Sequence, residues 1–375
     1  MKKYTYKLFP FLICVVFLFP IVKENIATLS IILLALNLIL YKVSSRDFKF
    51  IERKQLFLII PFLIISVFSV FSTNAKISLV HINHSLLFLI VPVIFSLIPK
   101  EMFSLEKLHL YFNTLKNLCL LIAFIYIISF FLNNPVWKFN IEFHNESPFR
   151  NYIYNDFKWF KIHPTYYTTI LIFCVAHAFN EVLEKQKYFQ LLYVFAFLGI
   201  TFLLLTKLTI VLMVALLFYM FLFKSTLSSV YKGVGILASV LSLFILVQYT
   251  PGIKNRFVEV YKSINVKPKE LAFDSTNIRK AIFDCSTNLV KENWVTGVGF
   301  ENLQAKLNEC YAANYDSSFY ENHNYLTHNY YLYIFISTGI FGFIFYLFYL
   351  ATIIKISLKS NLFLKFEILI NPSFL

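Results

Sequence analysis

Apolar runs long enough to cross a lipid bilayer dominate this 375-residue sequence. A transmembrane helix needs roughly 20 mainly apolar residues, with about 17 to 25 as the working range. Ten such runs lie at residues 8–22, 25–41, 55–72, 84–98, 117–132, 165–181, 188–205, 207–223, 233–249 and 328–350. The chain is 58% hydrophobic and only 14% charged, so a water-soluble fold could not bury its apolar surface. The sequence therefore predicts an all-α polytopic membrane protein.

The two ends of the chain affect the number of spans. The first run follows three lysines and resembles the apolar part of a signal peptide. No small-residue cleavage site precedes Lys23 and a second run follows at once, so we expect the segment to remain uncleaved. Residues 361–375 are apolar but interrupted by Lys365, Glu367 and Pro372, which leaves an eleventh, incomplete span open. We expect a bundle of about 10 to 12 transmembrane helices.

Basic side chains are concentrated in alternate loops of the predicted topology. One set of loops holds 17 cations and six acids, whereas the other short loops hold only Lys23, Lys76 and Lys207. Short cytoplasmic loops are enriched in Lys and Arg, so the N-terminus and the end of the tenth span should be cytoplasmic. Most of the net charge of +14 is thus a topology signal, and we expect a lipid bilayer and no nucleic acid as partner.

This topology divides the chain into five parts. These are residues 1–132 with five membrane helices, 133–164 as the first external loop, 165–249 with helices six to nine, 250–327 as a large external loop, and 328–375 with the tenth helix and the tail. Both external loops are nearly neutral and rich in Asn and Tyr. Aromatic rings stack on apolar sugar faces and amides hydrogen-bond hydroxyls, although a plain solvated loop has the same composition.

The sequence lacks residues that several classes of membrane protein need for their function. No Asp or Glu lies in the middle of the ten predicted spans, which disfavours an ion-coupled transporter. The loop at residues 23–25 is too small to present acidic metal ligands, and Gly297 with Gly299 forms only a lone Gly-x-Gly, which is more often a turn than a phosphate-binding loop. We therefore expect no catalytic metal ion and no cofactor.

The five cysteines fall into two groups. Cys14, Cys119 and Cys174 lie within apolar spans, where cysteine behaves as a small hydrophobic residue. Cys285 and Cys310 both lie in the large external loop. An extracytoplasmic compartment permits a disulfide between them, so the sequence leaves open a disulfide or two free thiols.

The start of the tenth span contains the candidate catalytic residue. If Thr327 caps the helix, His328 is its first residue, and Gly339 and Gly342 fall within about 40° of the same face. Glycines on one face permit close helix approach, so His328 should point into the bundle. A helix N-terminus lowers the pKa of an imidazole, which would leave His328 neutral and able to act as a base. The alternative is a polar residue that caps the span at the membrane surface.

The spacing of these residues resembles a known signature. His328-Asn329, nine further residues, Gly339, two residues and Gly342 are similar to the motif of the O-antigen ligase and O-antigen polymerase superfamily. The run Thr296–Asn302 resembles the Gly-x-Gly stretch of that family, and Lys161–Tyr167 resembles the segment that follows an external arginine. The resemblance extends over most of the chain from about residue 150 to residue 349.

The resemblance implies a GT-C-like glycosyltransferase of the bacterial inner membrane, with its site facing the periplasm. Such enzymes transfer a glycan from undecaprenyl diphosphate to an acceptor hydroxyl, with inversion at the anomeric carbon and without a metal. His328 would take the acceptor proton, a role worth about 10²- to 10⁴-fold in rate. Arg279 and Arg150 would bind the diphosphate in place of a metal, although for each arginine a headgroup contact or a loop salt bridge is the alternative.

Four further residues are candidates for substrate binding, namely Asn329, His323, Lys207 and His163. His323 could join the site or merely lie on the loop, while His163 before Pro164 could shape the entry to the sixth span. The family commonly has an arginine beside a Ser or Thr where this chain has Lys207, which could equally be an ordinary hairpin cation. Family members usually have one or two further spans after the signature.

Three functions remain as alternatives. The first is a ligase that joins a finished O-antigen to the lipid A core. The second is a polymerase that uses the same donor and extends a growing glycan on the carrier. The third is a non-catalytic flippase or exporter, which would leave the long external loop and its histidine unexplained. The histidine signature favours ligase-like chemistry.

Overall fold

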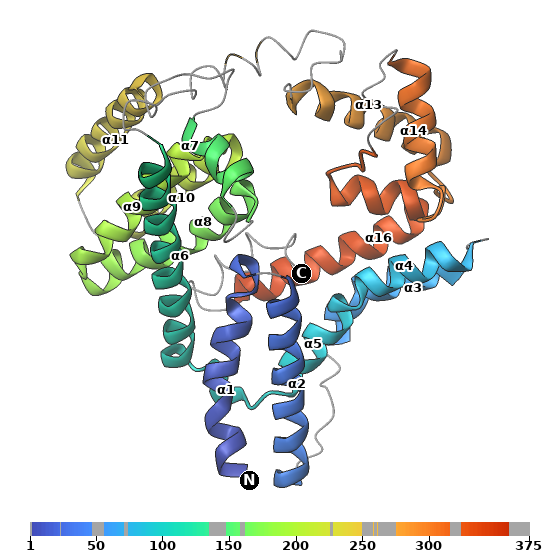
Figure 1. The fold of residues 1–375 in the computed structure, drawn as a ribbon, viewed down its shortest axis with the longest axis horizontal. Helices are drawn as coiled ribbons and strands as arrows, with labels where there is room; N and C mark the ends of the chain where they lie inside the picture. Colours follow the sequence, from blue (N-terminus) through green and yellow to red (C-terminus); the bar gives the residue numbers. More distant parts are fainter. Residues whose placement is uncertain are drawn as a thin grey trace. The chain divides into compact units, whose positions relative to one another are not determined.

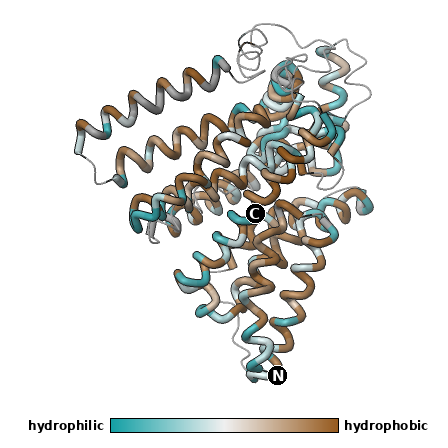
Figure 2. Tube along the Cα trace, turned by 60° about the vertical axis from the view of Figure 1, so that its left-hand side comes forward, coloured by the Kyte–Doolittle hydropathy of each residue, from teal (hydrophilic) through white to brown (hydrophobic). Residues whose placement is uncertain are grey.

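The protein is all-helical over the residues that its structure describes. The computed structural model describes residues 2–22, 24–46, 56–70, 74–134, 148–157, 162–225, 228–249, 258, 261, 275–315 and 324–359. No strand occurs among these residues (Figure 1). Six described helical stretches are long and apolar enough to cross a membrane: Asn25–Ser45, Lys76–Leu97, Leu105–Asn133, Pro164–Lys185, Lys207–Lys224 and Tyr330–Ile356. Figure 2 shows their predominantly hydrophobic colouring. The predicted class, an all-α polytopic membrane protein, is confirmed.

The predicted count of about 10 to 12 spans is not reproduced by these six stretches. Four other predicted spans do coincide with helices, namely α1 (Lys2–Phe17), α3 (Ile60–Val70), α9 (Leu191–Leu203) and α11 (Ser229–Tyr249). The predicted span at 84–98 starts earlier, because α4 (Ala75–Ser85) and α5 (Leu87–Leu97) together form the stretch Lys76–Leu97. The segment 361–375, for which an eleventh span was left open, lies outside the described residues.

The chain forms two compact units, and unit 1 comprises Met1–Phe48 and Ile98–Val258. Helices α1 and α2 (Glu24–Ser45) lie side by side (Figure 1), and the buried Asn37 donates its amide N–H to the Thr5 carbonyl oxygen at 3.0 Å. Helix α8 (Pro164–Lys185) is the core element, since 72% of its apolar window is buried against 22–39% in the other candidate spans of this unit.

Hydroxyl groups on α8 join it to its neighbours in unit 1. The Tyr167 hydroxyl donates to the Cys119 carbonyl oxygen on α6 (Leu105–Asn133) at 2.6 Å. The Thr209 hydroxyl on α10 (Lys207–Lys224) donates to the Thr168 hydroxyl oxygen at 3.0 Å. These bonds satisfy polar groups that lipid could not solvate, so they fix α6 and α10 against α8.

Unit 2 comprises Lys49–Leu97 and Glu259–Leu375. Within it, α13 (Ser275–Asn293) and α14 (Leu303–Asn314) are joined by a disulfide between Cys285 and Cys310, which decides between the two alternatives left open above. Both helices pack on Ile336 of α16 (Tyr330–Lys359), which is fully buried. The second half of α16 packs on α3 through Tyr346, Tyr349 and neighbouring aliphatic side chains.

Helix α16 is interrupted at Gly339. This residue has φ 64° and ψ −162°, a conformation essentially restricted to glycine. The break releases helical hydrogen bonds, and the segment Trp294–Gly299 replaces them. The N–H groups of Val298 and Gly299 donate to the carbonyl oxygens of Ile336 and Ser337 at 2.8 and 3.0 Å. The Ile340 N–H donates to the Trp294 carbonyl oxygen at 2.8 Å. We call this arrangement the 294–299/336–340 backbone contact.

Glycine is required on both sides of this contact. A Cβ atom at Gly339 would lie 2.2 Å from the Val295 carbonyl oxygen and 2.8 Å from the Gly297 nitrogen. A Cβ atom at Gly297, whose φ is 72°, would lie 2.6 Å from the Gly339 nitrogen. The two main chains therefore approach more closely than any side chain would permit. Sequence motifs that were interpreted separately, the Gly-x-Gly stretch and Gly339 of the last span, form one backbone structure.

We expect Gly339→Ala to destabilise the protein by about 3 kcal/mol, because the new methyl group meets main-chain atoms and the backbone leaves its glycine-only conformation. Gly199→Ala in α9 is the matched control, since nothing lies within 4 Å of the added Cβ atom. That variant should match the wild type. The measurement is the melting temperature of the purified protein in detergent, and equal melting temperatures of the two variants would contradict the contact.

Candidate functional site

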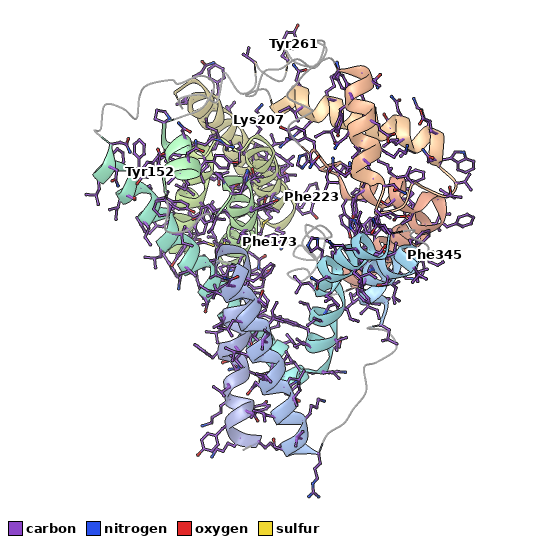
Figure 3. The ribbon with its side chains drawn as sticks, turned by 45° about the vertical axis from the view of Figure 1, so that its right-hand side comes forward. Tyr152, Phe173, Lys207, Phe223, Tyr261 and Phe345 are labelled. Carbon is purple, nitrogen blue, oxygen red and sulfur yellow. A yellow bond between two sulfur atoms is a disulfide. The ribbon has the colours of Figure 1, made fainter. Side chains whose placement is uncertain are left out.

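Three of the predicted site residues lie in unit 1, at the ends of helices. Arg150 is in the short helix α7 (Pro148–Asn151), His163 precedes α8, and Lys207 is the first residue of α10, labelled in Figure 3. The neighbouring Phe149 is buried and packs edge-to-face on Phe130 of α6, with ring centroids 5.3 Å apart. Buried aromatic packing thus anchors α7 against unit 1.

The Arg150 side chain contacts the turn between α9 and α10. One guanidinium nitrogen, Nη1, donates a hydrogen bond to the Leu204 carbonyl oxygen. In the same turn, Leu205 adopts a left-handed conformation with φ 51°, and Lys207 follows two residues later. The structure therefore brings the cation of Arg150 to the turn that also carries Lys207.

His163 has a clear structural role. Its Nδ1 accepts a hydrogen bond from the Thr165 N–H at 3.2 Å, and Pro164 occupies the first position of α8. The imidazole therefore caps the helix, as expected for a residue that shapes the entry to this span. The rings of Tyr154 and Tyr166 lie 5.3 and 5.4 Å from the imidazole, centroid to centroid. His163 thus lies among aromatic rings at this end of α8.

His328, Asn329 and Arg279 lie in unit 2, and the local geometry of His328 differs from the expectation. Asn329, not Thr327, caps α16: its Oδ1 accepts hydrogen bonds from the N–H groups of Tyr331 and Leu332 at 2.9 and 3.3 Å. His328 precedes the helix in a left-handed conformation with φ 47°. The expectation that His328 is the first helical residue is wrong, because the Asn329 side chain satisfies the helical N–H groups instead.

The glycines also have a different relation to His328 from the one expected. Gly339 breaks the helix and His328 precedes it, so they do not share a helical face. The absence of a side chain at Gly342 leaves room for Thr338 of the same helix. A Cβ atom at Gly342 would lie 2.2 Å from the Thr338 hydroxyl oxygen. The side chain of His328 is exposed, and the expectation that it points into the bundle stays a prediction.

The electrostatic environment of His328 keeps its imidazole neutral. Partial burial lowers the pKa of His328, and the positive charge of Arg279 lowers it further. Arg279 is an exposed residue of α13, whose residues Ala281, Ile282 and Cys285 are buried. A lowered pKa of His328 was also expected from the sequence, with a helix N-terminus as its cause. In the structure the causes are partial burial and a neighbouring cation. An exposed, neutral imidazole beside a guanidinium can accept a proton close to a bound anion.

Two of the predicted substrate-binding residues need comment. The Oδ1 atom of Asn329 is engaged in capping α16, so the residue has a structural function. His323 lies outside the described residues.

The structure also brings together three residues to which the sequence patterns gave no role, namely His109 on α6 and His177 and Glu181 on α8. The four-residue spacing of His177 and Glu181 on one helix was the available signal.

The fold and these residues define a polytopic all-α membrane protein with polar and cationic groups at helix ends. A family model described as O-antigen ligase matches residues 192–347, from α9 into α16. The matched segment includes Arg279, His328 and the 294–299/336–340 backbone contact. The predicted resemblance to the O-antigen ligase superfamily, whose members are glycosyltransferase-like membrane enzymes, is therefore confirmed. Searches of curated proteins and of solved structures give no match.

The pKa of His328 should depend on the charge at position 279. Arg279→Gln removes the cation, so the protonated imidazole becomes less unfavourable and the pKa of His328 rises. Arg279→Lys keeps the charge and should leave the pKa near that of the wild type. The measurement is the pH midpoint of diethyl pyrocarbonate labelling at His328, quantified by peptide mass spectrometry. An unchanged midpoint in Arg279→Gln would contradict the assigned cause.

Proposed function

We propose that this protein is an O-antigen ligase-like glycosyltransferase. It moves an O-antigen or related surface glycan from undecaprenyl diphosphate to an acceptor hydroxyl, with the lipid A core as acceptor. The observation that carries the proposal is that the O-antigen ligase match contains an exposed, neutral His328 beside Arg279. A general base and a cation are the two groups that transfer from a diphosphate donor requires.

The reaction is a single displacement that inverts the configuration at the anomeric carbon. His328 takes the proton from the acceptor hydroxyl as its oxygen attacks C1 of the donor sugar. The bond between C1 and the phosphate oxygen breaks, and undecaprenyl diphosphate leaves with the bonding electron pair. Negative charge on the diphosphate grows as that bond breaks, so bound cations stabilise the transition state more than the ground state.

Cationic side chains are the proposed diphosphate ligands. Arg279 in unit 2 is a diphosphate ligand, because its guanidinium can form two parallel charge-assisted hydrogen bonds to phosphate oxygens. Within unit 1, Arg150 and Lys207 share the turn between α9 and α10 and stay candidate residues for diphosphate and substrate binding. His163, His323 and Asn329 are further groups for sugar hydroxyls. Cations in these roles make a metal ion unnecessary for the transfer.

The site faces the periplasm in a bundle of about 10 to 12 helices of GT-C-like architecture in the inner membrane. Support comes from the alternation of basic loops, which puts the N-terminus in the cytoplasm and the His328 end of α16 outside. A repeat-unit polymerase is the alternative function. It uses the same donor and differs in the acceptor, which would then be a growing glycan. A non-catalytic flippase or exporter would need no base and would leave the long external loop and its histidine unexplained.

We expect His328→Ala to abolish glycan transfer while expression and folding stay intact, because the imidazole is the proposed base and its residue is exposed. The control is His84→Ala, another exposed histidine of unit 2 outside the proposed machinery. The measurement is the envelope glycan profile of a deletion strain complemented with wild type or variant, on a gel that resolves chain lengths.

Each outcome of that profile separates the alternatives. In the deletion strain, polymer on the carrier with none on the lipid A core indicates a ligase. Single repeat units on the core indicate a polymerase. Normal transfer by His328→Ala would contradict the assignment of the base, and an unchanged profile in the deletion strain would contradict both transferase functions.

Arg279→Lys should lose most of the transfer activity although it keeps the charge, because an ammonium cannot reproduce the planar, two-pronged contact with the diphosphate. The measurement is the same glycan profile, with protein amounts matched by immunoblot. Full activity of this variant would make Arg279 a structural residue.

A further inference from the structure

A compact group of metal-ligand side chains lies within unit 1, away from the His163 end of α8. His177 and Glu181 are one helical turn apart on α8, and His109 comes from α6. At a rise of 1.5 Å per residue, Glu181 lies about 27 Å along the helix from His163. The proposed transferase chemistry uses none of these three residues.

The spacing of their ligand atoms fits a transition-metal ion. His109 Nδ1 lies 3.1 Å from His177 Nε2 and 3.7 Å from Glu181 Oε1. One ligand atom from each residue lies within 4.8 Å of the others. Ligands about 2.0–2.1 Å from a tetrahedral zinc ion are about 3.3 Å from one another. Two imidazole nitrogens and a carboxylate oxygen are thus separated as three ligands of one ion would be.

The surroundings favour a bound cation. The side chains of His177 and Glu181 are almost fully buried, with 1% and 3% of their surface exposed. The ring of Phe112 stacks on the imidazole of His177, with centroids 5.5 Å apart. A buried carboxylate needs a positive partner, because desolvation without one costs several kcal/mol. His109 is only partly buried, so the group opens to solvent on one side.

Two lysines supply that positive charge in this structure. Lys185 Nζ lies 2.7 Å from Glu181 Oε1 and 3.2 Å from His109 Nε2, while Lys187 Nζ lies 2.8 Å from Glu181 Oε2. Donation from Lys185 to His109 Nε2 puts the ring proton on Nδ1, where it is donated to His177 Nε2. With Lys185 in this position, His109 accepts a hydrogen bond at Nε2 and donates one from Nδ1, and Glu181 has a positive partner.

A metal ion and Lys185 exclude each other from this group. An ion bound to His109 Nδ1 forces the ring proton to Nε2, and that N–H then faces the Lys185 ammonium. The ion would also take Glu181 Oε1, the atom that Lys185 contacts. The Lys185 side chain is 42% exposed, so it can move into solvent. Lys187 contacts the other carboxylate oxygen and can stay to orient it, as partners of ligating carboxylates do.

We propose that His109, His177 and Glu181 form a binding site for a divalent transition-metal ion such as Zn²⁺, with Lys185 as a competing internal cation. Imidazole and carboxylate ligands are typical for zinc, and water completes the coordination. The ion links α6 to α8 and so stabilises the core of unit 1. By the predicted topology, this end of α8 faces the cytoplasm, so the site responds to cytoplasmic metal.

The test uses the purified full-length protein in detergent, stripped with a chelator and titrated with zinc chloride against a chromophoric zinc indicator. The wild type should bind one zinc ion per chain, and zinc should raise its melting temperature. His109→Ala should weaken binding at least 10-fold and abolish the rise. Lys185→Met should strengthen binding about 10-fold, because it removes the competing cation. His84→Ala, a histidine of unit 2, should behave as the wild type.

Three results would overturn the proposal. The first is less than one zinc ion per chain in the wild type. The second is equal affinity in wild type and His109→Ala, which would locate the bound zinc elsewhere. The third is weaker binding in Lys185→Met, which would show that Lys185 supports binding instead of competing. His109 is only partly buried, so its replacement should leave the fold intact, and melting without zinc checks this.

Discussion

The need to pair every main-chain polar group governs this structure, because lipid offers no hydrogen-bond partners. Helix α16 would meet that need alone if it were regular. It breaks at Gly339, and the freed carbonyl oxygens of Ile336 and Ser337 accept N–H groups from Val298 and Gly299. The segment Trp294–Gly299 is therefore fixed to a candidate membrane span by main-chain bonds, which are independent of side-chain identity except where glycine is required.

This contact organises the elements that carry the proposed site in unit 2. The segment Trp294–Gly299 follows α13 directly, so its attachment to α16 also fixes the end of α13. The disulfide between Cys285 and Cys310 and the cluster around Ile336 hold α13 and α14 together on the same helix. Arg279 on α13 and His328 before α16 thus lie on connected elements, which is how the charge of Arg279 acts on the imidazole.

Features set by local composition could be predicted from the sequence. Apolar runs indicated the helices, and the spacing of His328, Gly339 and Gly342 indicated a resemblance to the family whose model matches residues 192–347. Features set by tertiary contacts were beyond the sequence. The conformation of Gly339 depends on a segment about 40 residues upstream, and the capping role of Asn329 depends on a choice between adjacent residues.

The polar interior of unit 1 likewise combines features visible in the sequence with contacts that depend on tertiary structure. Glu181 was expected near a cytoplasmic loop, and its spacing from His177 was visible in the sequence. Its partner His109 comes from another helix, 68 residues before His177, and no local pattern indicates that pairing. The contact of Arg150 with the Leu204 carbonyl oxygen is likewise non-local. Sequence patterns located single functional residues, whereas packing determined which of them meet.

The 294–299/336–340 backbone contact holds the segment Trp294–Gly299 to α16. The most direct measurement is amide hydrogen exchange, followed by mass spectrometry on peptides that resolve Val298, Gly299 and Ile340. These three amides should exchange as slowly as those in the core of α16, because each donates to a main-chain carbonyl oxygen. Exchange as fast as that of the exposed residues Asn324 and Leu326 would contradict it.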